Sequence, residues 1–498
     1  MESQNINPED QKIIENRELK IWEALIPVIL LMALLAYNIF FADGVMLGDY
    51  SNQFILIIGG IIAAIVGFFN KATFQCMLVE IWGNLKTTFV PILILVLVGA
   101  LAGTWLISGV IPAMVYYGLQ VLSPSVFLPA SVIICAIISI ATGSSWTTSA
   151  TVGIALIGIG GALGIDSGMI AGAVISGAYF GDKMSPLSDT TNLAPALAGT
   201  DLFTHIKYMA FTTVPTILIT LVVFGILSTT IETSGSADIS LLLKSIDTTF
   251  HITPWLFLVP LIVVALVLFK TNPLIALGSG VVMAIIFAFI FQPEVLNNLD
   301  SSKIDAVVTS IFTDTQIQTD NEKLNELFSS GGIIGMIWTI LLIIAAMVFG
   351  GIMDAIGALA KITKVLLSIA SSAFGLFATT VISCLGLNII ASDQYLAIVI
   401  PGKMFKDAYK DKGLAPENLS RTLEDAGTVT SVLIPWNTCG AYQSSVLGVG
   451  VADYFIYAVF NWLSPFMTLL FAAFSIKIKQ LVEKEPAMST LKEGPSPL

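Results

Sequence analysis

Charged residues are scarce in this sequence, because Asp, Glu, Lys and Arg make up only 11% of its 498 residues. A soluble domain has about 25% charged residues, and the mean hydropathy of +0.89 is far from that class. The 34 acidic and 22 basic side chains give a net charge of -12. This negative charge opposes binding of the chain to nucleic acid or to an anionic lipid surface.

Residue types that carry much of enzyme chemistry are also rare. The two histidines, His205 and His251, provide no histidine triad and no histidine metal cluster. The four cysteines have none of the spacings of zinc or haem sites. The sequence GxxxxGK[ST] of an ATP-driven motor does not occur. We therefore expect no enzyme and no cofactor, and any energy-requiring process would draw on ion gradients or on a separate subunit.

Hydrophobic runs, in contrast, follow one another along the whole chain. A bilayer-spanning helix needs about 20 mostly apolar residues. Clear runs lie at 22–42, 53–69, 88–109, 125–141, 205–231, 254–269, 272–291, 331–353, 372–390 and 451–476. More polar runs lie at 144–164, 168–183, 392–408 and 418–435. The sequence predicts an all-α polytopic membrane protein with about 12–14 transmembrane or re-entrant helices.

The distribution of basic residues predicts the orientation of these helices. Lys12, Arg17 and Lys20 precede the first run, and the loop after it is acidic. By the positive-inside rule, the N-terminus then lies in the cytoplasm. If all fourteen runs cross, Lys477 and Lys479 also lie inside, so both termini are predicted to be cytoplasmic. The first residues are too polar for a secretory signal peptide.

Two parts of the chain share one order of elements. Residues 86–231 and 331–476 both contain a long span, a short amphipathic linker, a span, a polar break, two polar segments and a final span. Pro186 lies near Pro435 in this comparison. The charge argument starts one part inside and the other outside, so they are predicted to be inverted repeats, which are typical of secondary transporters. Chance similarity of apolar segments is the alternative.

The remaining segments complete a division into five parts. They are a cytoplasmic N-terminus with two spans and an amphipathic helix at 1–85, acidic external loops and two connecting spans at 232–330, and a cytoplasmic tail at 477–498.

Polar side chains interrupt the apolar sequence most sharply at 177–201. Pro186 breaks the helix there, and ionisable groups at membrane depth are candidates for ion or proton handling. Asp189 is the first candidate for a carboxylate that binds a cation or a proton, and Asp182 is the second. Lys183 offers the alternative that Asp182 belongs to a structural ion pair. The neighbouring oxygen ligands are Ser188, Thr190, Thr191 and Asn192.

Hard cations such as Na+ prefer oxygen ligands, so we predict a Na+ site at Asp189, Thr190 and Asn192. The segment 141–151 adds a face of hydroxyl groups from Ser144, Ser145 and Thr148. These hydroxyls would complete the ligand shell. The alternative is that small hydroxyl residues only allow close helix packing.

The second repeat has its own polar groups. Asp393 is a third candidate carboxylate, although it could also cap the helix that follows it. The further site or pathway residues of this repeat are Asn388, Ser392, Glu424, Asp425, Thr428 and Asn437. Arg421 lies three residues before Glu424 and four before Asp425, so we expect it to neutralise one of these carboxylates.

Basic side chains within the polar segments are limited to Lys183, Lys403 and Arg421. A carrier of organic acids usually uses a guanidinium or helix N-termini against the substrate carboxylate. With so few cations, a small inorganic cation is the simpler cargo.

The runs GSSWTTSATVGIALIGIG and SGAYFGDKMSPLSDTTNLAPALAGTD closely resemble the NhaC-type Na+/H+ antiporters, and LEDAGTVTSVLIPWNTCG also fits that family. The resemblance covers roughly residues 20–476. It implies exchange of internal Na+ for external protons across a bacterial cytoplasmic membrane. It also implies a distant similarity to inverted-repeat carriers that move by an elevator motion, often as homodimers.

Two other functions remain open from the sequence. The same family includes carriers that exchange malate for lactate or carry amino acids, and such a carrier would place Lys183, Lys403 or Arg421 in its central cavity. A passive channel or a structural subunit of a larger pump is the second alternative, and the paired broken segments argue against it.

Overall fold

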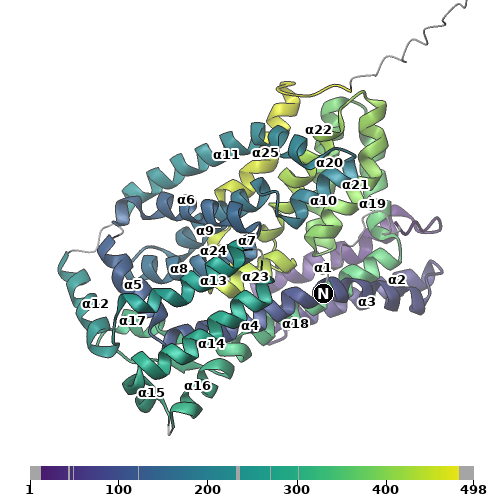
Figure 1. The fold of residues 1–498 in the computed structure, drawn as a ribbon. Helices are drawn as coiled ribbons and strands as arrows, with labels where there is room; N and C mark the ends of the chain where they lie inside the picture. Colours follow the sequence, from purple (N-terminus) through teal and green to yellow (C-terminus); the bar gives the residue numbers. More distant parts are fainter. Residues whose placement is uncertain are drawn as a thin grey trace, which may run out of the picture.

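The computed structural model describes residues 13–42, 45–48, 50–121, 123–231, 236–269, 271–300 and 302–481. This part of the chain is almost entirely helical (Figure 1). Its one sheet pairs β1 (Thr315–Gln316) antiparallel with β2 (Ser329–Ser330). Inside a bilayer each backbone group must find its partner within the chain, which favours helices. Lys12 and the tail beyond residue 481 lie outside the described residues.

Eight helices in the described ranges are long and apolar enough to cross a membrane. They are α1 (Ile21–Phe41), α2 (Ser51–Phe69), α4 (Phe89–Ile107), α6 (Pro124–Thr142), α11 (Leu202–Thr230), α14 (Pro273–Phe291), α18 (Gly332–Ala355) and α20 (Ala373–Ile390). Each coincides with a clear apolar run of the sequence, which confirms the prediction of a polytopic membrane protein.

The two other clear runs form shorter or bent elements. Residues 254–269 form η2 (Pro254–Phe257) and α13 (Leu258–Leu268), and this stretch bends by 88° from α12 (Ser236–Thr249). Residues 451–476 form α24 (Val451–Tyr454) and α25 (Val459–Ala473).

The more polar runs contain the breaks. Run 144–164 is divided into α7 (Ser145–Thr148), the π-helix η1 (Ser149–Gly153) and α8 (Ile154–Ala162). Run 418–435 is divided into α22 (Pro416–Leu423), the π-helix η3 (Glu424–Thr428) and the 3-10 turn η4 (Ser431–Leu433). Side-chain hydroxyls compete for backbone hydrogen bonds, which weakens a regular α-helix at these positions. The other two runs form α9 (Ser167–Met184) and α21 (Gln394–Asp411).

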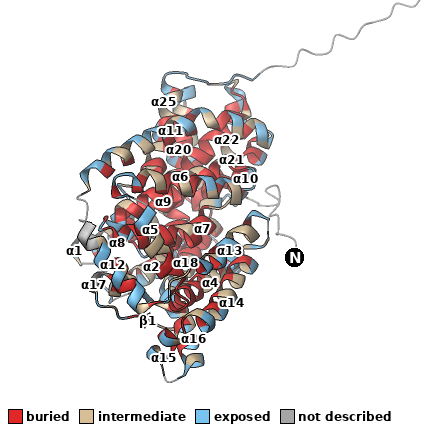
Figure 2. Cartoon of the chain, turned by 60° about the vertical axis from the view of Figure 1, so that its left-hand side comes forward, coloured by how far each residue is buried: buried red, intermediate tan, exposed pale blue. Residues whose placement is uncertain are grey.

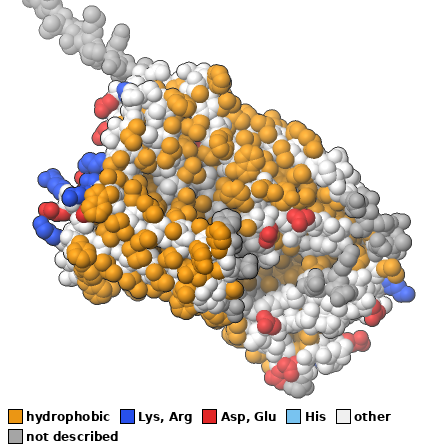
Figure 3. Space-filling view, turned by 180° about the vertical axis from the view of Figure 1, so that it is seen from behind, with side chains coloured by type: hydrophobic (Ala, Val, Ile, Leu, Met, Phe, Trp, Pro, Cys, Tyr) orange, Lys and Arg blue, Asp and Glu red, His pale blue; other side chains and the backbone are white. Residues whose placement is uncertain are grey.

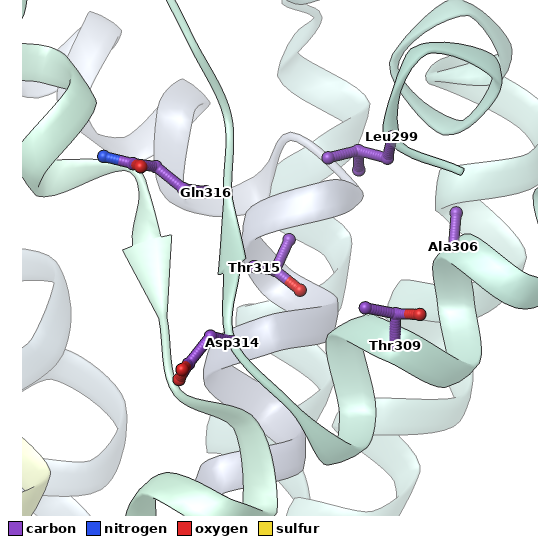
Figure 4. A pocket seen from close by; sticks show the side chains of 6 residues that line it. All are labelled: Leu299, Ala306, Thr309, Asp314, Thr315 and Gln316. Carbon is purple, nitrogen blue, oxygen red and sulfur yellow. The ribbon is translucent and has the colours of Figure 1, made fainter.

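Shorter helices connect these elements. They are α3 (Phe74–Thr87), α5 (Val110–Val121), α10 (Asp189–Ala198), α19 (Ala358–Ile369) and α23 (Thr438–Leu447). The acidic segment 293–330, expected as loop, folds into α15 (Pro293–Leu299), α16 (Lys303–Phe312), α17 (Glu322–Leu327) and the small sheet. A cavity of 230 Å³ lies there (Figure 4), lined by Leu299, Ala306, Thr309, Asp314, Thr315 and Gln316, and none of these is a predicted site residue.

Small residues let α9 pack directly on α6 in the middle of the molecule. A methyl group on Gly177 would lie 2.3 Å from the Val132 carbonyl oxygen, and one on Gly181 would lie 2.5 Å from that of Ala136. Such close backbone approach is how membrane helices gain packing energy. Figure 2 shows buried residues concentrated in α9, α21 and α22, and α9 carries the predicted site residues Asp182 and Lys183.

The order of elements from α4 to α11 recurs from α18 to α25. Residues with left-handed backbone recur as well, at an offset of 248 or 249 residues. The pairs are Gly109 and Gly357, Gly143 and Ser392, Gly164 and Gly413, and Gly199 and Gly448. The helix-capping side chains Ser144 and Asp393 have the same offset, and so do the caps Ser188 and Asn437.

Charged side chains gather at the two ends of the molecule. Figure 3 shows most of the visible Lys and Arg at one end and several Asp and Glu at the opposite end, with an apolar surface between them. A hydrophobic band between polar ends is what a bilayer-embedded protein presents to lipid.

Gly103 offers a test of how α4 packs against α16. A methyl group on Gly103 would lie 1.8 Å from the backbone carbonyl oxygen of Ser310, which cannot move without shifting α16. We expect Gly103→Ala to lower the free energy of unfolding by about 1–3 kcal/mol, measured as a lower melting temperature in detergent. Gly278→Ala in α14 is the control, because nothing lies within 4 Å of its added methyl group. Equal melting temperatures of the two variants would contradict this packing.

Candidate functional site

Asp182 lies at the centre of a cluster of oxygen atoms. Its Oδ2 accepts hydrogen bonds from the Ser145 hydroxyl at 2.7 Å and from the Ser145 backbone N–H at 3.2 Å. The Ser188 hydroxyl also lies against this carboxylate and is 3.2 Å from the hydroxyl of Thr190. The Thr191 hydroxyl donates to the backbone carbonyls of Asp182 and Lys183. The structure thus brings the predicted hydroxyl residues Ser145 and Ser188 to the Asp182 carboxylate.

Three helix ends build this cluster. α7 begins beside Asp182, with Ser144 as its cap, after the left-handed turn at Gly143. α9 ends just after Asp182, and α10 begins at Asp189 with Ser188 as its cap. The N-termini of α7 and α10 favour negative charge nearby through their free N–H groups. The Thr148 hydroxyl, in contrast, donates to the Ser144 carbonyl at 2.9 Å within its own helix.

Asp189 and Asn192 stand apart from this cluster. Both side chains lie on the exposed side of α10, and the Asn192 amide donates to the carbonyls of Pro186 and Ser188. The Asp189 carboxylate faces the hydroxyl of Tyr395 in α21. Sequence reasoning missed Tyr395, which also lies near Asp182 and Asp393; its place two residues after Asp393 was the available signal.

The polar groups of the second half mainly hold its broken helices in place. Asp393 is buried and caps α21 by accepting from the Leu396 N–H at 3.0 Å, as the alternative reading predicted. The Asn388 amide donates to the Gly427 carbonyl at 2.7 Å in the π-helix η3. The Asn437 amide donates to the Asn388 carbonyl at 3.0 Å. Ser392 has left-handed backbone and its carbonyl accepts from the Thr438 N–H.

A fully buried ion pair links the two halves. The Lys183 ammonium in α9 pairs with Asp425 Oδ1 in η3, and both side chains are 0% exposed. The same Asp425 carboxylate accepts from hydroxyls of Thr212 in α11 and of Ser464 and Thr468 in α25. Sequence reasoning missed these three hydroxyl residues. The row of threonines in α11 was a signal for Thr212, and no comparable pattern marks Ser464 and Thr468 in α25.

This geometry corrects two predicted pairings. Lys183 pairs with Asp425 across the molecule and not with its neighbour Asp182. Arg421 makes no ion pair among the described residues, so it neutralises neither Glu424 nor Asp425. Its guanidinium lies 4.6 Å from the centre of the Tyr208 ring in α11 instead. The reason is that Asp425 is already paired with Lys183, while the Arg421 guanidinium packs against the aromatic rings of Tyr208 and Phe471.

Glu424 is the second carboxylate of interest. It is 0% exposed, and neither of its carboxylate oxygens has a hydrogen-bond partner among the described residues. Lys183, Asp182 and Asp425 all lie within electrostatic range of it. The buried hydroxyl of Thr428, one turn further on, lies near this carboxylate but makes no hydrogen bond of normal geometry in this part of the chain. Lys403 lies on α21 with a half-buried side chain.

These contacts define what the interior can do. Two buried carboxylates lie near one buried ion pair. Asp182 has hydroxyl ligands around it, whereas Glu424 accepts no hydrogen bond of normal geometry from the described residues. Among the described residues no three His, Cys, Asp or Glu side chains form a metal cluster. Hydroxyl and carboxylate oxygens at broken helices suit a weakly held hard cation that must also leave.

A polytopic helical protein with buried carboxylates at its helix breaks belongs to the class of membrane transport proteins. The family model described as the Na+/H+ antiporter family matches residues 177–476. The chain belongs to this family.

Several curated relatives are similar over most of their length. The chain is 40% identical to the Na(+)/H(+) antiporter NhaC of Alkalihalophilus pseudofirmus over 85% of this chain and 90% of that protein. It is 38% identical to the Na(+)/H(+) antiporter NhaC of Bacillus subtilis over 78% of this chain and 84% of that protein. It is 34% identical to the Malate-2H(+)/Na(+)-lactate antiporter of Bacillus subtilis over 86% and 89%, respectively.

The buried ion pair predicts an unusual pattern of stabilities. Lys183→Met or Asp425→Leu alone leaves one uncompensated buried charge, so each should destabilise the protein by about 3–5 kcal/mol. The double variant Lys183→Met/Asp425→Leu removes both charges and should lose much less than the sum of the two single effects. Melting temperatures in one detergent provide the measurement. Additive losses in the double variant would show that the two side chains do not depend on each other.

Proposed function

We propose that the protein exchanges Na+ for H+ across a bacterial cytoplasmic membrane as a secondary active antiporter. The observation that carries this proposal is the oxygen cluster around Asp182, which offers carboxylate, hydroxyl and carbonyl oxygens at the meeting point of three helix ends. These are the ligands that hard cations prefer. The two NhaC antiporters and the family description point to the same pair of ions.

Na+ would bind between Asp182, Ser145, Ser188 and Thr190 in this proposal. Asp189 and Asn192, on the exposed side of α10, would then form the approach to the site and receive the ion first. Asp393 would act through its cap on α21 and through Tyr395, which faces both Asp189 and Asp393. This assignment moves the main cation-binding role from Asp189 to Asp182.

Glu424 would carry a proton. A buried carboxylate without a protein partner is unstable as an anion, so it must be neutralised by a proton or by a cation. Lys183 is already paired with Asp425 and supplies no full counter-charge to it. Na+ at Asp182 adds positive charge nearby, which favours release of the proton from Glu424. The two gradients are coupled because the site does not hold both ions together.

Movement of the site would follow from two inverted repeats, 86–231 and 331–476. The recurrence of element order, left-handed turns and capping side chains at one offset supports this division. Alternating access in such carriers rocks or lifts one unit against the other around the site. We extend the proposal to cytoplasmic N- and C-termini, which the basic residues Arg17, Lys20, Lys477 and Lys479 support, and to an elevator-type motion in a homodimer.

Transport of an organic anion is the second candidate. The specific observation is Arg421, whose guanidinium is 0% exposed and whose three nitrogen atoms have no hydrogen-bond partner among the described residues. The relative that is named a malate and lactate antiporter makes this alternative concrete. Proteoliposomes with a trapped pH dye distinguish the two, because Na+ alone should discharge a proton gradient in an Na+/H+ antiporter. A response that required malate, lactate or an amino acid would favour the anion carrier.

Substitutions at the two carboxylates should have different effects. We expect Asp182→Asn to abolish both Na+ binding and Na+-driven proton flux, because the charged ligand is lost. Glu424→Gln should keep Na+ binding, measured by isothermal titration, but lower Na+-driven proton flux at least tenfold, because the proton carrier is lost. Asp201→Asn is the control, since Asp201 is exposed and caps α11. Full exchange in Asp182→Asn would refute the assignment.

Competition between the two ions also predicts a pH dependence. The proton and Na+ exclude each other, so lower pH must weaken Na+ binding. In the range where the free site is protonated, the apparent KM for Na+ should rise about tenfold for each proton displaced and each unit of pH decrease. Initial rates in proteoliposomes at several pH values test this. An apparent KM that stayed constant over two pH units would contradict direct coupling.

A further inference from the structure

A second cavity lies away from the carboxylates, beneath the N-terminal segment. Its volume is 180 Å³, and it is lined by Glu15, Asn16, Arg17, Gly357, Ala360, Lys361 and Lys364. A single water molecule needs about 10–15 Å³ on the same measure. The cavity is therefore large enough for a phosphate group with part of the group that it esterifies.

The charges around this cavity suit an anion. Lys364 pairs with Glu15 at 3.0 Å, whereas neither Arg17 nor Lys361 makes an ion pair among the described residues. A guanidinium presents a fork of N–H donors that matches a phosphate. Helix α19 begins at this cavity, and its first residue follows Gly357, which provides no capping side chain. The free N–H groups of that helix end add partial positive charge.

Two exposed tryptophans beside lysines indicate where the membrane interface lies around this part of the chain. Trp22 is 57% exposed and carries the Lys20 ammonium over its ring, and Trp82 is 61% exposed with Lys86 in the same arrangement. Exposed tryptophans beside lysines are typical of the boundary between headgroups and hydrocarbon. Arg17 precedes Trp22 by five residues and is exposed.

Apolar surface adjoins the same segment. The Asn16 amide donates to the Asn70 carbonyl at 3.1 Å, and Lys71 pairs with Glu18 at 3.2 Å, so residues 16–18 lie on the corner between α2 and α3. Phe69 and Phe74 at this corner are 85% and 62% exposed. A ligand at this place would have its anionic group in the cavity and hydrocarbon against these rings.

We propose that this cavity binds the phosphate headgroup of an anionic glycerophospholipid. Arg17 and Lys361 would hold the phosphate, and the acyl chains would lie along the corner of α2 and α3. The net charge of -12 for the whole chain opposes such binding, but charges more than about 8 Å away are largely screened at physiological salt. The surplus of basic groups around the cavity therefore determines whether an anion binds there.

Binding there would connect two parts of the protein. The N-terminal segment leads into α1, and α19 joins α18 to α20 and packs against α1, α20 and α21. A lipid bridging Arg17 and Lys361 would fix α19 against α1. Helix α19 packs against α20, which carries Asn388, and against α21, which Asp393 caps. The lipid would therefore contact a helix that adjoins the polar residues of the second half.

The test is direct binding to the purified full chain in an uncharged detergent. The probes are dioctanoylphosphatidylglycerol, dioctanoylphosphatidylcholine and inorganic phosphate, measured by microscale thermophoresis. We expect phosphatidylglycerol to bind at least tenfold more tightly than phosphatidylcholine. Arg17→Gln/Lys361→Gln should weaken that binding about tenfold or more, whereas Lys406→Gln/Lys410→Gln, which removes two exposed lysines of α21, should change it less than twofold.

Other outcomes would overturn the proposal. Equal binding of phosphatidylglycerol by the Arg17 and Lys361 variant and the unchanged protein would place the lipid elsewhere. Tight binding of inorganic phosphate alone would show a site for a free anion and not for a lipid. Ala360→Leu fills the cavity without changing charge, so it should also weaken binding. Gel filtration shows whether each variant is folded. If the charge variant is not folded, binding by Ala360→Leu tests the proposal instead.

Discussion

A charge in the interior of a membrane protein must be neutralised there, and the pair of Lys183 and Asp425 is the most complete example in this chain. Both side chains are fully buried, and hydroxyls from α11 and α25 complete the shell of the carboxylate. Removing two charges from water costs several kcal/mol for each ion, which only good geometry can offset. The pair therefore fixes α9, η3, α11 and α25 relative to one another, and the other polar groups are arranged around that junction.

The neighbouring carboxylates differ in how they satisfy the same constraint. Asp182 has the hydroxyl and N–H of Ser145 within hydrogen-bond distance, so oxygen ligands and donors surround its charge. Glu424 has no such partner in the described part of the chain. A carboxylate of the second kind depends on a proton or a cation for its neutrality. An exchanger needs carboxylates of both kinds. Its site must be stable when either ion is bound and unstable when neither is bound.

The breaks in the helices create this arrangement. Unbroken α-helices satisfy their own backbone and offer no free carbonyl or N–H groups at membrane depth. The π-helices η1 and η3, the turn at Gly143 and the left-handed Ser392 release such groups in both halves. The capping side chains Ser144, Ser188, Asp393 and Asn437 then hold each new helix start in place.

The sequence by itself determined the membrane class, the eight long spans and the break at Pro186, because hydrophobic length and local residues act over one or two turns. It did not predict the π-helices η1 and η3 or the 88° bend before Pro254. It also identified Asp182, Ser145 and Glu424 as polar groups in apolar surroundings. Only the tertiary structure decided which of them meet. Lys183 and Asp425 are 242 residues apart, and no local pattern connects them. Arg421 likewise packs on the rings of Tyr208 and Phe471 and not on the carboxylates that helical spacing offered, because side chains of other helices compete for the same groups.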